Sequence, residues 1–150
     1  MSTGTATREA TISACVQALQ QISQANGYQN NPIVERTLES YNVNENPCVI
    51  YCAEYEEFEE ISHLAFGTEM GKIAMVVQGK ITGTQANINS LIDDIRQALE
   101  SEANTVSAYI SITRAATYRN YADENDPRLF CDVYFNVLYT YDIPLGVPPY

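Results

Sequence analysis

The stretch that most constrains the fold lies near the end of the chain, where apolar and polar residues alternate from Leu129 to Asp142. Side chains of a strand point alternately to opposite faces, so this pattern predicts a long strand with one face in a core. Tyr134 and Leu138 interrupt the other, polar face, which indicates that it also contacts protein, in the same chain or in a neighbour. The core-side positions are Cys131, Val133, Phe135, Val137, Tyr139 and Tyr141.

The remaining periodicities predict two helices and several further strands. Apolar residues recur with helical spacing over 7–26, which ends before Gly27, and over 84–103. Strand patterns occupy 48–58, 72–81 and 106–113, Ile33 and Val34 favour a short edge strand, and 118–127 reads as a polar hairpin connection. The glycines at 67 and 71 indicate a flexible turn.

These elements predict one α+β domain over residues 1–150. We expect an antiparallel or mixed sheet of about four to five strands, two helices packed on one face, and a long β-hairpin. The first residues, 1–6, are expected to be flexible, and the proline-rich tail over 143–150 to be an arm or disordered. A chain of 150 residues buries enough surface to fold without disulfides or metals.

Composition excludes several classes of function. With 8 basic and 19 acidic residues the net charge is −11, so an adhesive nucleic-acid surface is not expected. No apolar run approaches a membrane span and the first residues contain no signal core, so we expect a cytoplasmic protein without membrane contact. The four cysteines lack metal-binding spacing and are expected to be buried free thiols.

Candidate catalytic groups are weak, and we expect no enzyme, cofactor or metal site. The sequence Gly67–Ile73 has a passing likeness to a phosphate loop, but it is one residue short and ends in Ile73 where Ser or Thr is required. His63 is the only histidine, falls in an expected acidic loop and has no evident base-orienting partner. Asp123, Glu124 and Asp126 lack calcium-loop spacing and are read as hairpin residues.

The most acidic segment follows the 48–53 apolar run. Such a run either faces solvent, holds a divalent cation or occupies a special electrostatic environment, and a solvated strand end is the simplest of these interpretations. Its five carboxylates are Glu54, Glu56, Glu57, Glu59 and Glu60.

The chain contains 11 tyrosines, which suit surfaces that are wet in one state and packed in another. Plain core packing explains some of them equally well. The candidate contact residues are Tyr109, Tyr118, Tyr121, Tyr134, Leu138, Tyr139 and Tyr141.

Taken in order, the elements resemble the tail terminator, or tail completion, proteins of tailed bacteriophages. The resemblance is carried by a first helix ending in Asn26-Gly27-Tyr28, an apolar strand led by Pro47, the helix segment Leu91–Arg96 and the closing strand Asp132–Tyr139. It covers nearly the whole chain, and it lies in the order of elements more than in any single motif.

The resemblance implies a structural virion protein that forms a ring, usually of six copies, at the head-proximal end of the tail tube. Such a ring ends tail polymerisation and joins the head, so the expected partners are further copies, the tail tube protein, the head-completion or connector protein and, in a contractile tail, the sheath. The protein would be in the host cytoplasm during assembly and in the neck of the virion afterwards. The family has no catalytic residues to carry over.

DNA would pass through an acidic ring without being held, and we expect the five glutamates of the acidic segment to line that channel. The alternatives are another neck or baseplate ring component, or a small cytosolic module that binds a peptide or ligand through its tyrosines.

Overall fold

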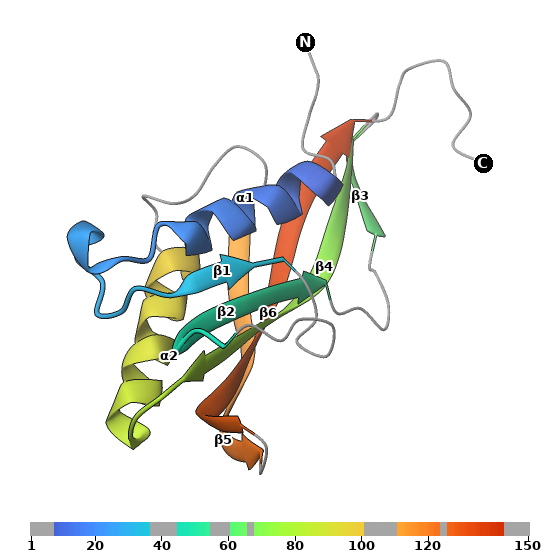
Figure 1. The fold of residues 1–150 in the computed structure, drawn as a ribbon. Coiled ribbons are helices and arrows are strands. Elements are labelled where there is room, and N and C mark those ends of the chain that lie inside the picture. The colour runs from blue at the N-terminus through green and yellow to red at the C-terminus, as the bar shows by residue number, and fades with distance from the viewer. Residues whose placement is uncertain are drawn as a thin grey trace.

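The computed structural model describes residues 8–36, 45–54, 61–65, 68–100, 111–123 and 126–142; for 61–65, 68–70, 111–123 and 140–142 it describes the backbone alone. Two helices and a mixed sheet make up these residues (Figure 1). In chain order the elements are α1 (Arg8–Gln20), the 3-10 helix η1 (Gln24–Asn26), β1 (Ile33–Glu35), β2 (Cys48–Glu54), β3 (Ile61–Ala65), β4 (Thr68–Ile81), α2 (Gln85–Glu100), β5 (Ser111–Asp123) and β6 (Asp126–Asp142).

The sheet has six strands and is built around β4 and β6. Its order is β1-β2-β4-β6-β5, and β3 pairs with the first part of β4. β1 runs parallel to β2, whereas the other pairs are antiparallel, so the sheet is mixed. The register between β4 and β6 is unbroken from Thr68 opposite Asp142 to Ile81 opposite Leu129. The predicted α+β class is confirmed, and β3 is the strand that the sequence pattern did not predict.

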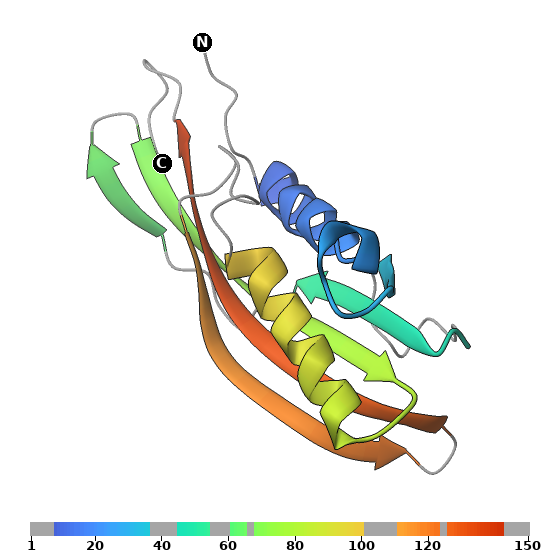
Figure 2. The same ribbon diagram turned by 90° about the vertical axis from the view of Figure 1, so that its left-hand side faces the viewer.

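Both helices pack on one face of the sheet (Figures 1 and 2). α2 buries the stripe Ile88, Leu91, Ile92, Ile95 and Leu99, as its periodicity predicted. The helix-facing residues of β6 are buried as predicted, from Cys131 through Phe135 to Val137. The predicted helix over 7–26 is α1 and η1, separated by a break at 21–23 and closed by Gly27 at φ 90°.

All four cysteines are free, as expected, with Cys48 half-buried and the others buried. Burial raises the pKa of the Cys15 and Cys131 thiols to about 12 and that of Cys48 to about 11. The pKa of Cys52 is also raised by burial, and its Sγ lies 3.4 Å from the sulfur of Met75. These thiols act as small apolar groups of the core.

Three sequence predictions were wrong in detail: the connection over 118–127, the loop around His63 and the turn at Gly71. Residues 118–123 and 126–127 are not a connection, because β5 and β6 pair up to Asp123 opposite Asp126. β5 has irregularities of register at three places, which lets a polar segment stay paired along its length. His63 lies in β3, opposite Glu69, and not in a loop.

Gly71 lies inside β4 and not in a turn. A side chain at this position would come within 2.6 Å of the ring of Tyr139, its partner on β6. Glycine is therefore required here for close approach of an aromatic ring to the backbone. Beyond this point the ends of β4 and β6 project past the helices together with β3 (Figures 1 and 2).

Candidate functional site

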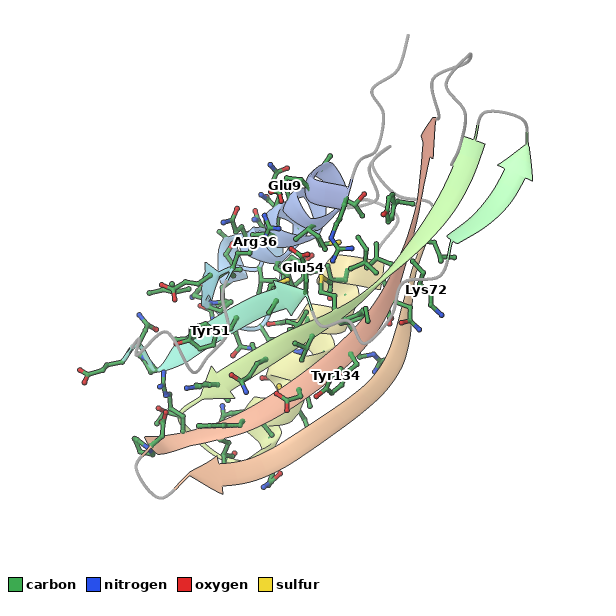
Figure 3. All side chains as sticks on the ribbon, turned by 90° about the vertical axis from the view of Figure 1, so that its right-hand side faces the viewer. Glu9, Arg36, Tyr51, Glu54, Lys72 and Tyr134 are labelled. Atoms are coloured by element: carbon green, nitrogen blue, oxygen red, sulfur yellow. The ribbon has the colours of Figure 1, made fainter. Side chains whose placement is uncertain are left out.

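The face of the sheet opposite the helices holds the candidate site. Figure 3 views the sheet from this side, with Lys72 and Tyr134 in front of the ribbon and α2 behind it. Three neighbouring cross-strand pairs on β4 and β6 line the middle of this face, and all six residues are partly exposed. We call this set the open strip: Lys72, Ala74, Val76, Tyr134, Asn136 and Leu138.

The open strip combines apolar and polar groups in a regular array. Val76 lies opposite Tyr134, Ala74 opposite Asn136, and Lys72 opposite Leu138. Cross-strand neighbours of this kind stand about 5 Å apart, so the six side chains form one continuous surface. No helix of the described ranges covers it. A tyrosine flanked by aliphatic side chains and an amide is typical of contact surfaces that are wet before a partner binds.

One end of the same face is closed by a buried cation. Lys80 is only 2 % exposed, and its Nζ lies 4.8 Å from the centre of the Phe130 ring and 5.4 Å from that of Tyr51. The Oδ2 atom of Asp126 is 3.6 Å from this Nζ. Ring faces and a carboxylate thus stabilise an ammonium group that has lost nearly all contact with solvent.

Asp126 also binds Arg128, two residues along the same strand. The guanidinium donates from Nε to Oδ1 at 2.8 Å and from Nη2 to Oδ2 at 2.7 Å, and the Arg128 backbone N–H donates to Oδ1 at 3.0 Å. These hydrogen bonds lower the pKa of Asp126 to about 2. Arg128 Nη1 donates to the carbonyl of Asn46 at 2.8 Å, which fixes the segment before β2 to the start of β6. We call Tyr51, Lys80, Asp126, Arg128 and Phe130 the lysine cluster.

A second ion-pair cluster involves the first glutamate of the acidic segment. Arg8 donates to Glu54 Oε2 from Nη2 at 2.9 Å and from Nε at 3.2 Å, and Arg36 donates to Oε1 at 2.7 Å. Arg36 also binds Glu9 (Figure 3). Burial raises the pKa of Glu54, but the two arginines lower it more, so it lies below its usual value. Hydrogen bonds from Arg36 and Ser13 likewise lower the pKa of Glu9.

The charge of Glu54 is therefore balanced within the chain. Of the five glutamates expected in the channel it is the only one among the described residues, since Glu56, Glu57, Glu59 and Glu60 lie outside them. β2 and β3 pair with the same edge of β4. Glu54 at the end of β2 lies opposite Met75, and Ile61 at the start of β3 lies opposite Gly71, four residues away along β4. The residues on either side of 55–60 thus both lie at this edge.

The candidate contact residues fall into three groups. Tyr134 and Leu138 lie in the open strip, on either side of Asn136 on β6. Tyr139 belongs to the core and is 6 % exposed, so its ring packs inside this chain. For three others the structure gives only the backbone position in the sheet: Tyr118 is opposite Asp132, Tyr121 opposite Phe130 and Tyr141 opposite Glu69. Tyr109 lies outside the described residues.

Sequence reasoning missed the lysine cluster. Lys80 falls within the predicted strand 72–81 and Asp126 within the predicted connection, and neither was expected to belong to a buried cluster. The available signal was the spacing of Asp126 and Arg128, which places opposite charges on one face of a strand. The burial of the lysine cluster could not be read from the sequence, because this burial depends on the pairing of Lys80 on β4 with Phe130 on β6.

The described residues contain no group of three metal-binding side chains, and none of their helices is long and apolar enough to cross a membrane. No protein-family model matches the chain. A search of the curated proteins also finds no match.

Proposed function

We propose that this protein is a structural ring protein of a bacteriophage tail, which caps the head-proximal end of the tail tube and ends tail polymerisation. The ring would then present the surface to which the head-completion or connector protein binds. The proposal comes from the resemblance in the order of elements. It concerns assembly, and it assigns no catalytic residue, cofactor or metal.

The observation that carries the proposal is the open strip. A two-layer α+β domain covers one face of its sheet with its own helices and leaves the middle of the other face for contact. Tyr134 and Leu138 on this face are the residues for which the alternation pattern predicts a protein contact. A ring assembled from such subunits buries this strip, which supports Tyr134 and Leu138 as interface residues.

Charge supports the same assignment. The net charge of −11 opposes tight binding of DNA, as a channel for passing DNA requires. Glu54 is neutralised by Arg8 and Arg36, so the proposed channel lining is now assigned to Glu56, Glu57, Glu59 and Glu60. The tail tube protein, the connector and, in a contractile tail, the sheath are the partners that this placement requires.

The test uses polymerising tail tube protein with and without the purified chain, and measures tube length by negative-stain microscopy. We expect shorter tubes, each capped at one end. A Tyr134→Asp, Leu138→Asp variant should lose this effect, because it places two carboxylates in the proposed contact. The matched control is Gln85→Asp, Gln97→Asp on the exposed side of α2. Tubes of unchanged length with the native chain would refute the proposal.

A further inference from the structure

Residues 10–34 form an uncharged surface beside the ion pair of Glu9 and Arg36. Residues 10–34 contain no Asp, Glu, Lys, Arg or His, although the chain carries 19 acidic and 8 basic residues. They form most of α1, all of η1 and the start of β1. Most of their exposed side chains are amides or small. We call the following exposed residues the amide face: Ala10, Gln17, Gln20, Gln21, Gln24 and Ala25.

The exposed side of α2 is different in kind. Asp93, Arg96, Gln97 and Glu100 line a shallow groove there, and three of these four residues are charged. A surface of this composition repels or attracts other charged surfaces, whereas the amide face does neither. The exposed side of α2 is thus largely charged, whereas that of α1 is neutral beyond Glu9.

The open strip matches the amide face in charge. It carries one cation, Lys72, and no carboxylate. Two copies of a chain with net charge −11 repel each other, and the repulsion at contact is smallest where neither surface contributes negative charge. The glutamine side chains of α1 can both donate and accept hydrogen bonds, which suits the hydroxyl of Tyr134 and the amide of Asn136.

The two surfaces lie on opposite sides of the molecule. The open strip is on the helix-free face of the sheet, and the amide face is the outer side of α1 on the other face (Figures 2 and 3). A contact between unlike surfaces of successive copies is heterologous, and it closes into a ring when the rotation between copies allows. Such a contact leaves no open strip and no amide face uncovered in the closed ring.

We propose that the open strip of each copy packs against the amide face of the next copy. This inference rests on the proposed ring function, because it names which surfaces meet in the ring. It assigns α1 to an intersubunit contact that the sequence did not indicate.

Photo-cross-linking tests the contact. Tyr134 is replaced by p-benzoyl-L-phenylalanine, the protein is irradiated in its assembled and monomeric fractions, and tryptic peptides are identified by mass spectrometry. Because residues 9–36 contain no Lys or Arg before Arg36, η1 and all of α1 after Arg8 fall in one tryptic peptide. The cross-linker lies in the peptide 129–150, and α2 is divided between 81–96 and 97–114. Contacts with α1 and with α2 therefore give different products.

We expect a product joining 129–150 to 9–36, in the assembled fraction only, since the sheet separates Tyr134 from α1 within one chain. Rings that give a product with another peptide would overturn the inference and leave the ring function standing. Failure to form rings at any concentration, alone or on tail tubes, would overturn both.

Charged variants give an independent readout. Gln17→Glu with Gln20→Glu places two carboxylates on the amide face, where the contact would bury them. We expect the concentration for half-assembly to rise by about tenfold or more. The control, Gln85→Glu with Gln97→Glu on α2, adds the same charge away from the contact. It should change the concentration for half-assembly by less than about twofold. Equal effects of the two variants would contradict the proposed contact.

Discussion

The lysine cluster gives a prediction whose size follows from its geometry. Asp126→Asn removes the carboxylate shared by Lys80 and Arg128, both of which are more than nine-tenths buried. Loss of one partner from a buried ion pair costs about 3–5 kcal/mol. Asparagine keeps one oxygen that can accept a hydrogen bond from Arg128, so we expect a loss of about 2–4 kcal/mol in the free energy of unfolding.

Urea unfolding at pH 7, followed by far-UV circular dichroism, measures this loss. The matched control is Asp132→Asn on the same face of β6, where Asp132 is half-buried and accepts a hydrogen bond from Gln78 at 3.2 Å. The control should lose less than about 1.5 kcal/mol. If Asp126→Asn were no more destabilising than Asp132→Asn, the ion pairs would not stabilise this end of the sheet.

The pH dependence tests the same carboxylate without removing it. The pKa of Asp126 is about 2 in the folded chain and 3.8 is its ordinary value. A lowered pKa stabilises the folded state above the ordinary value, and that stability is lost as the pH falls from about 4 to about 2. The shift corresponds to about 2 kcal/mol, which Asp126→Asn should remove from the acid branch of the stability profile. If Asp126→Asn left the acid branch of the stability profile unchanged, the lowered pKa could not be assigned to Asp126.

Two further predictions concern other parts of the fold and the channel. Gly71→Ala should destabilise the chain by about 1–3 kcal/mol in urea unfolding, because its Cβ would overlap the ring of Tyr139, and an unaffected midpoint would contradict this packing. Charge reversal of Glu56, Glu57 and Glu59 to lysine should impair DNA ejection while tails still join heads, since a basic channel would hold DNA; normal infection by such a phage would exclude the channel assignment.

The sequence predicted the elements whose pattern is strong and local. The alternation over 129–142 and the helical stripe from Ile88 to Leu99 each fix a buried face by themselves, so β6 and α2 were found with the correct orientation. The short β1 was also found, because Ile33 and Val34 are adjacent β-branched residues.

Features that depend on a distant partner were not found. β5 reads as a polar connection over 118–123, yet it is held as a strand by β6. β3 is short and contains Ser62 and His63, and it forms by pairing with the start of β4. Lys80 looks like a solvent-facing residue in an alternating strand, and only the sheet places Phe130 and Tyr51 around it. In each case the deciding contact lies far away in the sequence.

The candidate site was predicted in part for the same reason. Tyr134 and Leu138 break a local pattern, so they could be recognised as contact residues. Tyr139 was placed both on the core side of the strand and among the contact candidates, and the packing of its ring against Gly71 on another strand decides for the core. The amide face was not recognised either, since the absence of charge over 10–34 becomes informative only when these residues form an exposed helix side.

The central claim is that this chain assembles into a ring, and the most direct test is the mass of the purified protein by light scattering over a range of concentrations, with negative-stain images of the same samples. With a chain mass of 16.7 kDa, the account predicts a species of about 100 kDa that appears as a ring of six copies. A monomer at every concentration that also fails to bind the ends of purified tail tubes would contradict it.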